Sequence, residues 1–157
     1  MLFGGEERLS RLNGYLSELA EAGDTNGIQH VLRPLEKIGA LIKRSNEQLL
    51  EEIDKFTVAQ RDGSIIACAA LFPFYGDKCG EVAALAVAPE CRGHGQGDKL
   101  LDYIEKKAMS MGLGRLFLLT TRTSDWFISR GFLMHSFHLV TTMDCELNST
   151  AGHFSVL

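Results

Sequence analysis

The sequence predicts one folded domain of the α/β class. Helical patterns occupy its first third, a strand hairpin follows, and a buried strand then runs through a glycine-rich loop into another helix. A length of 157 residues suits one domain with its own core. Apolar residues make up 45% and charged residues 23% of the chain, and the mean hydropathy is +0.01. This composition is that of a globular protein, neither disordered nor embedded in a membrane.

Leucine spacing near the N-terminus predicts an amphipathic helix over residues 6–21. Leucines recur there at steps of three and four residues, at Leu9, Leu12, Leu16 and Leu19. We therefore expect a helical connector over residues 1–23, a folded domain over residues 24–140 and a divergent C-terminal tail over residues 141–157.

Two further helices are expected before the first predicted strand. The pattern over residues 27–36 follows Asp24 and Thr25, which are both good N-cap residues. Another helix should begin after Ser45, because Ser45 and Gln48 have the spacing of a capping box ahead of an apolar run. Both helices should bury their apolar faces against a sheet.

The pair Asp62-Gly63 between two apolar runs is a strong hairpin signal. It would join strands over residues 56–61 and 64–72. The next run, residues 81–88, is almost continuously apolar, which is typical of a strand buried on both faces. The last expected elements are a strand, a short helix and a final strand, over residues 115–120, 124–129 and 132–140.

A glycine-rich loop links the buried strand to a helix expected over residues 98–111. Gly93, Gly95 and Gly97 alternate, so the loop can adopt positive φ and gather several N–H groups at the helix N-terminus. Such a concavity binds a phosphate or pyrophosphate. The loop has neither the ending of a P-loop nor the GxGxxG spacing of dinucleotide-binding folds, which leaves coenzyme A as the pyrophosphate ligand. The alternative is a tight strand-to-helix turn with no ligand.

Charge and cysteine content restrict which partners and ligands the chain is expected to bind. Sixteen Lys and Arg against twenty Asp and Glu give a net charge of -4, so the chain as a whole does not attract nucleic acid or an anionic membrane. The four cysteines form no CxxC pair, and we expect reduced thiols in a soluble intracellular protein. His135 and His138 lack further ligands, so no metal is expected.

The loop and its flanks resemble motif A of the GCN5-related N-acetyltransferases. The matching stretch is Val87-Ala88-Pro89, two residues, and then Arg92-Gly93-His94-Gly95-Gln96-Gly97. Residues 27–132 are also similar to the acetyltransferase domain of N-acetylglutamate synthase, especially its plant members, through RPLEKIGALIKRS, ACAALFPF, CGEVAALAVAPECRGHGQGDKLLDYIEKKA and LFLLTTRTSDWFISRGF. This resemblance implies a mixed, mostly antiparallel central sheet flanked by helices. It also implies acetyl transfer from acetyl-CoA to the amino group of glutamate, the first step of arginine biosynthesis, in the chloroplast.

The same resemblance implies that acetyl-CoA binds at the end of the buried strand and at the glycine loop. Backbone N–H groups near a strand bulge would hold the thioester and pantetheine, and the loop would hold the pyrophosphate. The cofactor-binding residues so implied are Leu85, Ala86, Val87, Arg92, Gly93, His94, Gly95, Gln96, Gly97 and Asp98. His94 is expected to contribute its backbone rather than to act as a base.

Acetyl transfer to an amine needs a proton acceptor, and the resemblance places the catalytic glutamate at Glu81; the alternative there is a solvated charge. Many relatives protonate the thiolate with a tyrosine, but Phe127 stands at that position and cannot donate a proton. Thr120 matches the hydroxyl residue of the glutamate synthases, although threonine is also common in strands. Arg44 matches an arginine that binds the acceptor carboxylate, for which a planar guanidinium is well suited.

After Phe132 the sequence departs from that family, whose final strands help to hold glutamate. The family's upstream amino-acid-kinase-like domain has no counterpart in these residues, so a homo-oligomer or association with such a domain is expected. Arg33 and Lys43 are interpreted as solvated surface. Two other functions stay open: an acetyl-CoA-binding form without acceptor binding that acts as a partner or regulatory subunit, and a relative that acetylates another small amine.

Overall fold

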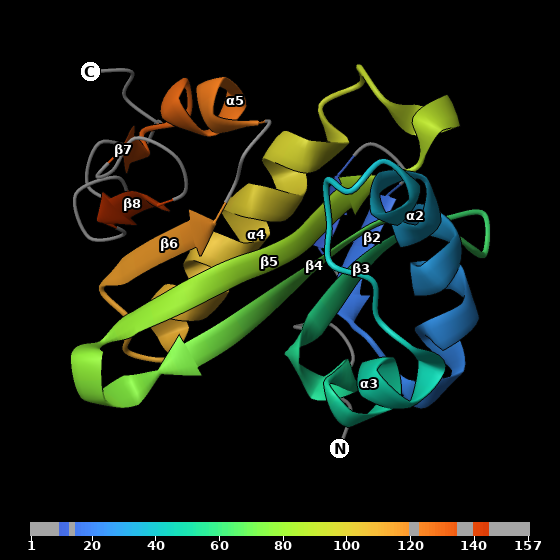
Figure 1. The fold of residues 1–157 in the computed structure, drawn as a ribbon, viewed down its shortest axis with the longest axis horizontal. Coiled ribbons are helices and arrows are strands. Elements are labelled where there is room, and N and C mark those ends of the chain that lie inside the picture. Colours follow the sequence, from blue (N-terminus) through green and yellow to red (C-terminus); the bar gives the residue numbers. More distant parts are fainter. Residues whose placement is uncertain (1–9, 13–14, 120–122, 135–139, 145–157) are drawn as a thin grey trace. The chain divides into compact units, whose positions relative to one another are not determined.

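The computed structural model describes residues 10–12, 15–119, 123–134 and 140–144 (Figure 1). The chain divides into two compact units, one of Met1–Ala70 with Ala84–Tyr103 and the other of Leu71–Ala83 with Ile104–Leu157. Three elements contribute residues to both units: strands β4 (Ser64–Phe74) and β5 (Cys79–Val87) and helix α4 (Gln96–Ser110). Strands β4 and β5 are neighbours, as Figure 1 shows.

The strands of the first unit follow the order β1-β2-β3-β4-β5. Strands β1 (Ser10–Leu12), β2 (Tyr15–Leu19), β3 (Phe56–Arg61) and β4 pair antiparallel in succession. Asp62 and Gly63 turn the chain between β3 and β4 with φ of 51° and 78°. Two positive φ values in a row are what a two-residue hairpin loop with the right twist needs, so the predicted hairpin is confirmed.

The helix predicted over residues 6–21 is wrong, because the described residues of that stretch form β1 and β2. Leu16 pairs with Gln60 and Leu19 with Thr57, so β3 supplies backbone hydrogen-bond partners along this segment. Leucine spacing carries information on local structure only, and pairing with a strand about forty residues further on overrides it.

The helices of the first unit bury apolar side chains. They are α2 (Thr25–Lys37), α3 (Asn46–Glu51) and the first turns of α4, with the short 3-10 helices η1 (Ala22–Asp24), η2 (Ile53–Lys55) and η4 (Pro89–Cys91). Helix α2 buries Ile28, Val31 and Leu32 completely or almost so. A Cβ on Gly27 of α2 would lie 2.6 Å from Ile65 of β4, so the helix and the strand approach each other closely.

Both helices predicted after the connector are confirmed, with one difference in their caps. The Gln48 N–H donates to Ser45 Oγ at 3.2 Å and the Ser45 N–H donates to Gln48 Oε1 at 2.9 Å, which is the predicted capping box. Asp24 lies at the N-cap of α2, but its carboxylate accepts from the N–H of Glu21 at 2.7 Å instead of from the helix.

The strands of the second unit follow the order β4-β5-β6-β8-β7. Its further elements are η3 (Tyr75–Asp77), β6 (Arg115–Leu119), α5 (Ser124–Ile128), β7 (Leu133–Met134) and β8 (Val140–Asp144). Strand β6 runs parallel to β5 and antiparallel to β8, and β7 pairs antiparallel with β8. The predicted mixed, mostly antiparallel sheet with flanking helices is therefore confirmed.

The core of the second unit lies against the backbone of β5. Leu71, Leu113 and Leu116 are at most 1% exposed. A Cβ on Gly80 would lie 2.7 Å from Leu71 Cδ1 and 3.1 Å from Leu113 Cδ1, so glycine at this position leaves room for both leucines. The ring of Phe127 packs edge-on against that of Phe132 with centroids 5.3 Å apart, which makes position 127 part of the core.

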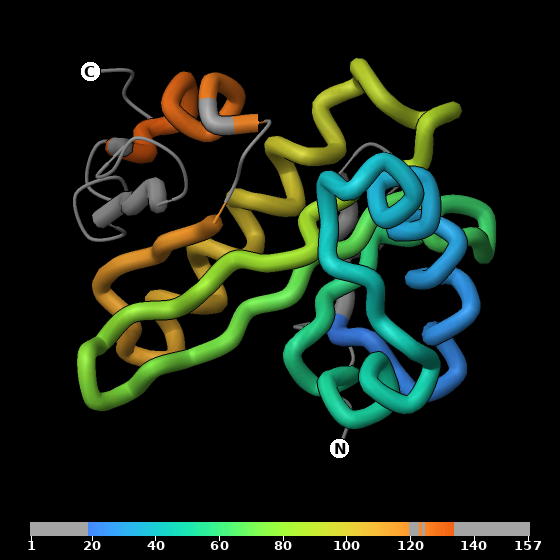
Figure 2. Tube along the Cα trace, in the orientation of Figure 1, coloured from blue at the N-terminus to red at the C-terminus, as the bar shows by residue number. Residues whose placement is uncertain are grey.

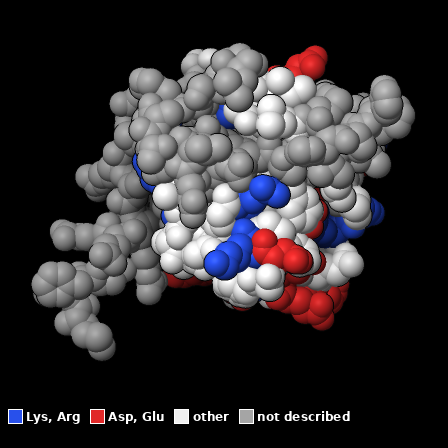
Figure 3. Space-filling view, turned by 90° about the vertical axis from the view of Figure 1, so that its left-hand side faces the viewer, with Lys and Arg blue, Asp and Glu red and all other residues white. Residues whose placement is uncertain are grey.

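Charged side chains of both signs lie next to each other on the described part of the face shown in Figure 3. This mixture agrees with the near balance of acidic and basic residues in the chain. Among the residues that the structure describes, no helix is long and apolar enough to cross a membrane.

Candidate functional site

Strand β5 changes its conformation at Ala84, in the middle of its length. Ala84 has φ of +51°, a left-handed value that costs a residue with a Cβ about 1–2 kcal/mol. Pairing with β6 covers only the first three residues of β5, of which the last is Glu81 opposite Phe117. A left-handed residue inside a strand interrupts the regular direction of the backbone N–H groups, and we interpret Ala84 as the bulge that the resemblance implies in this strand. The predicted thioester-binding residues Leu85, Ala86 and Val87 come directly after this bulge.

Cys68 of β4 is hydrogen-bonded to the bulge. Its thiol, which is fully buried, donates to the carbonyl oxygen of Ala84 at 3.5 Å. Burial raises the pKa of the Cys68 thiol to about 12, against a smaller opposing effect of the Arg44 charge. The thiol therefore keeps the proton that it donates.

The glycine loop leads from β5 into α4, as the path in Figure 2 shows. Gly93 and Gly95 have φ of +82° and +79°, and a Cβ on either would meet nothing within 4 Å. These two glycines are therefore needed for their backbone conformation and not for close packing. The Nε of Arg92 donates to the carbonyl oxygen of Val87 at 3.2 Å, which ties the loop back to the strand end.

Helix α4 begins at Gln96, two residues earlier than predicted. Gly97 and Asp98 consequently lie in its first turn, and Gly97 does not share the positive φ of the other two glycines. The Lys99 N–H donates to the Gly95 carbonyl at 3.2 Å, so the helical hydrogen bonds start from the loop itself. The first N–H groups of a fifteen-residue helix, which have no partner within the helix, thus adjoin the exposed loop residues.

The structure describes only one of the two predicted catalytic residues. Glu81 is half-buried on β5, three residues before Ala84. Thr120 lies outside the described residues, as do His135 and His138. In the described part of the chain, no group of three or more His, Cys, Asp or Glu side chains is close enough to hold a metal ion.

Arg44 lies between α2 and α3 and is held by a carboxylate from each side. Its backbone N–H donates to Glu36 Oε2 of α2 at 3.2 Å. Its Nε donates to Glu52 Oε2, just after α3, at 3.1 Å in an ion pair. The Arg44 side chain is only 15% exposed. Its two Nη groups make no hydrogen bond with the residues that the structure describes.

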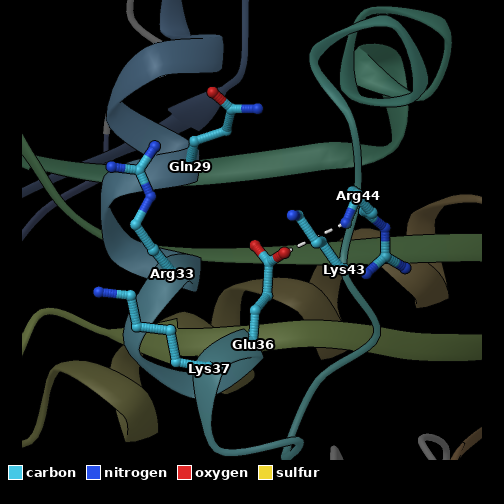
Figure 4. Close-up of a pocket in the computed structure, with 6 residues that line it drawn as sticks. All are labelled: Gln29, Arg33, Glu36, Lys37, Lys43 and Arg44. Carbon is cyan, nitrogen blue, oxygen red and sulfur yellow. Dashed lines mark hydrogen bonds between the residues drawn. The ribbon is translucent and has the colours of Figure 1, made fainter.

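Arg44 also lines a pocket of about 340 Å³, drawn in Figure 4. The other lining residues are Gln29, Arg33, Glu36, Lys37 and Lys43. Four cationic side chains and one carboxylate thus surround it, so the pocket suits an anion. The Glu36 carboxylate faces the Arg44 backbone in this view, whereas the guanidinium points away from α2.

Sequence reasoning did not find this pocket, since it treated Arg33 and Lys43 as solvated surface. Both side chains are exposed, yet they share the rim of one pocket with Arg44. The spacing of Gln29, Arg33 and Lys37, four residues apart on a predicted helix, was the available signal, because such residues share one face.

Comparison with known proteins identifies the family. A model of the acetyltransferase (GNAT) family matches residues 27–133. The chain belongs to this family. It is 51% identical over 117 residues to an amino-acid acetyltransferase of Pseudomonas paraeruginosa, with 73% of this chain and 27% of that protein covered. It is 52% identical over 128 residues to one of Salmonella arizonae, with 82% and 27% covered.

A solved relative shares the fold of this GNAT chain. The N-acetylglutamate synthase of Neisseria gonorrhoeae, complexed with coenzyme A and N-acetyl-glutamate, superposes with a TM-score of 0.82 at 33% identity. The match covers 87% of this chain and 36% of the synthase. The chain therefore spans about a quarter to a third of the length of the relatives that it matches.

Proposed function

We propose that this chain transfers the acetyl group of acetyl-CoA to the α-amino group of L-glutamate, giving N-acetylglutamate and CoA. The observation that carries the proposal is its similarity, over 87% of its residues, to a synthase whose structure holds coenzyme A and N-acetyl-glutamate. Amino-acid acetyltransferases at 51% and 52% identity support the same class of acceptor. The glycine loop, the Ala84 bulge and Arg44, all in the first unit, are suited to the cofactor and the acceptor.

Acetyl-CoA would supply an acyl thioester whose carbonyl carbon an amine can attack. Gly93 and Gly95, together with the first N–H groups of α4, present backbone donors that suit its pyrophosphate. The N–H groups of Leu85, Ala86 and Val87 would donate to pantetheine and to the oxygen on which negative charge develops. The left-handed conformation of Ala84, directly before these residues, supports this assignment.

Glu81 would take a proton from the ammonium group of glutamate, directly or through a water molecule. An α-amino group has a pKa near 8, so its deprotonation at pH 7 costs only about 1.4 kcal/mol, and a carboxylate is a sufficient base. The freed nitrogen can then form the new bond to the acyl carbon. Thr120 is the predicted donor of a proton to the sulfur once the carbon–sulfur bond has broken.

Arg44 would hold a carboxylate of glutamate through its two Nη groups. A guanidinium presents these two donors in one plane, with a spacing that matches the two oxygens of a carboxylate. Glutamate carries two carboxylates, and Arg33, Lys37 and Lys43 add positive charge near Arg44, which favours the approach of acidic acceptors.

The setting of the reaction is part of the same proposal. The resemblance to plant N-acetylglutamate synthases supports a role in arginine biosynthesis, the chloroplast as the compartment, and association with an amino-acid-kinase-like domain or with further copies of the chain. A fluorescent fusion in plant cells and size-exclusion chromatography with light scattering would test these points.

Steady-state release of CoA thiol tests the proposed reaction. We expect glutamate to give the highest kcat/KM in a panel that includes glutamine, aspartate, lysine and spermidine. A higher kcat/KM with another amine would contradict the glutamate assignment. If calorimetry shows that acetyl-CoA binds but no amine is turned over, the enzymatic activity is contradicted. That result would favour an acetyl-CoA-binding form that acts as a partner or regulatory subunit.

A further inference from the structure

One side-chain contact orients the guanidinium of Arg44 and leaves its two Nη groups available to a ligand. An arginine side chain has many rotamers, and holding it in one of them for a ligand costs conformational entropy. Glu52 restricts the Arg44 side chain, because Arg44 Nε, the inner nitrogen of the guanidinium, donates to Glu52 Oε2 at 3.1 Å. A carboxylate at Nε fixes the plane of the guanidinium but leaves the terminal Nη pair for a second carboxylate.

The position of Glu52 is fixed by the chain around it. It is the C-cap of α3, and its own N–H donates to the Gln48 carbonyl, so its backbone belongs to the last turn of that helix. A helix C-terminus carries partial negative charge and does not favour a carboxylate. Arg44 offsets this unfavourable placement, and the Glu52 side chain is 35% exposed, so the pair is partly shielded from water.

The guanidinium held by Glu52 belongs to the same unit as the glycine loop and the end of β5. An acceptor carboxylate bound by the Nη pair of Arg44 would lie in the unit that also carries the N–H groups proposed to hold the thioester.

We propose that Glu52 is a positioning residue for acceptor binding: through its ion pair with Arg44 Nε it sets the plane of the guanidinium that receives the acceptor's carboxylate. This inference rests on the proposed function of the site. Glu52 itself touches neither the acceptor nor acetyl-CoA. Its contribution should consequently appear in the KM for glutamate and not in kcat or in the affinity for acetyl-CoA.

The substitution Glu52→Gln tests this role, because it removes the charge and keeps the shape. We expect the KM for glutamate to rise about 5- to 10-fold, with kcat and the dissociation constant of acetyl-CoA within about twofold. The matched control is Glu51→Gln, an exposed neighbour that changes the net charge equally, and it should leave KM unchanged. In an Arg44→Ala background, Glu52→Gln should have no further effect on KM.

A second measurement needs no acceptor. An arginine-selective dicarbonyl reagent, followed by peptide mass spectrometry, should modify Arg44 about threefold faster or more in Glu52→Gln than in the unaltered chain or in Glu51→Gln. Equal rates, an unchanged KM in folded Glu52→Gln, or an equal rise in Glu51→Gln would overturn the positioning role. No turnover of glutamate by the unaltered chain would instead overturn the proposed function, whatever the modification rates.

Discussion

At the scale of single residues, Cys68 makes stability depend on alkaline pH. Burial raises its pKa from 9.0 to about 12. Above pH 9 the unfolded state releases the thiol proton while the folded state keeps it, so the unfolded state binds fewer protons. The stability that Cys68 contributes is therefore complete below pH 9 and is lost as the pH rises toward 12, by about 1.4 kcal/mol per pH unit.

Denaturant unfolding at pH 8 and pH 10 can measure this effect. Between these values the unaltered chain should lose about 1.4 kcal/mol more unfolding free energy than Cys68→Ala, which has no thiol at this position. Val58→Ala is the control, because Val58 pairs with Cys68 across β3 and β4 and its truncation leaves the thiol in place. That variant should show the same pH-dependent loss as the unaltered chain. A Cys68→Ala variant with the full loss would contradict the assignment.

Glu81 is the second residue whose role can be measured by itself. If it accepts the proton of the amine, Glu81→Gln should lower kcat about 10²- to 10⁴-fold with little change in acetyl-CoA affinity. Raising the pH should restore part of the rate, because more of the amine is then neutral. The exposed Glu90, next to the glycine loop, offers Glu90→Gln as a control with unchanged kcat. A wild-type kcat across pH 6 to 9 in Glu81→Gln would show that the glutamate is structural.

At the scale of elements, α4 provides a matched pair of glycines at its two ends. Gly95 precedes the helix and Gly112 follows it, both with φ of +79° and both with open space where a Cβ would lie. Valine at either position should therefore destabilise the fold by a similar amount, about 1–2 kcal/mol, through its backbone conformation alone. Only Gly95→Val should abolish acetyl-CoA binding, since only Gly95 belongs to the loop. Calorimetry with acetyl-CoA on both folded variants measures this difference. Equal acetyl-CoA affinities in the two variants would contradict the proposal that the glycine loop binds the cofactor.

Elements were predictable where their signals are local. The Asp62-Gly63 turn and the Ser45 capping box each involve at most four consecutive residues, and the structure confirms both. The start of α4 was placed two residues late because Gln96 and Gly97 were assigned to the loop by their glycine pattern. A helix can include one glycine at modest cost, and the pattern alone does not show which glycine that is.

At the scale of the whole molecule, the sequence predicted the sheet class and the glycine loop between a strand and a helix, but not features that depend on distant contacts. The residues of β2 were expected in a helix, and their pairing with β3 is visible only in three dimensions. The ion pair of Arg44 with Glu52 and the pocket that Arg44 shares with α2 depend on how two helices approach each other. Sequence periodicity carries no information on how two helices approach each other. The resemblance therefore identified Arg44 but not the residues around it.

The placement of the pocket beside Arg44 has a consequence for how the proposed acceptor specificity can evolve. Every residue that lines the pocket, and Glu52 as well, lies between positions 29 and 52, whereas the bulge and the cofactor loop lie between positions 84 and 98. The two sets share no residue. Under the proposed function, substitutions in the first segment would alter which amine is accepted, while the residues proposed to bind the acyl donor stay unchanged.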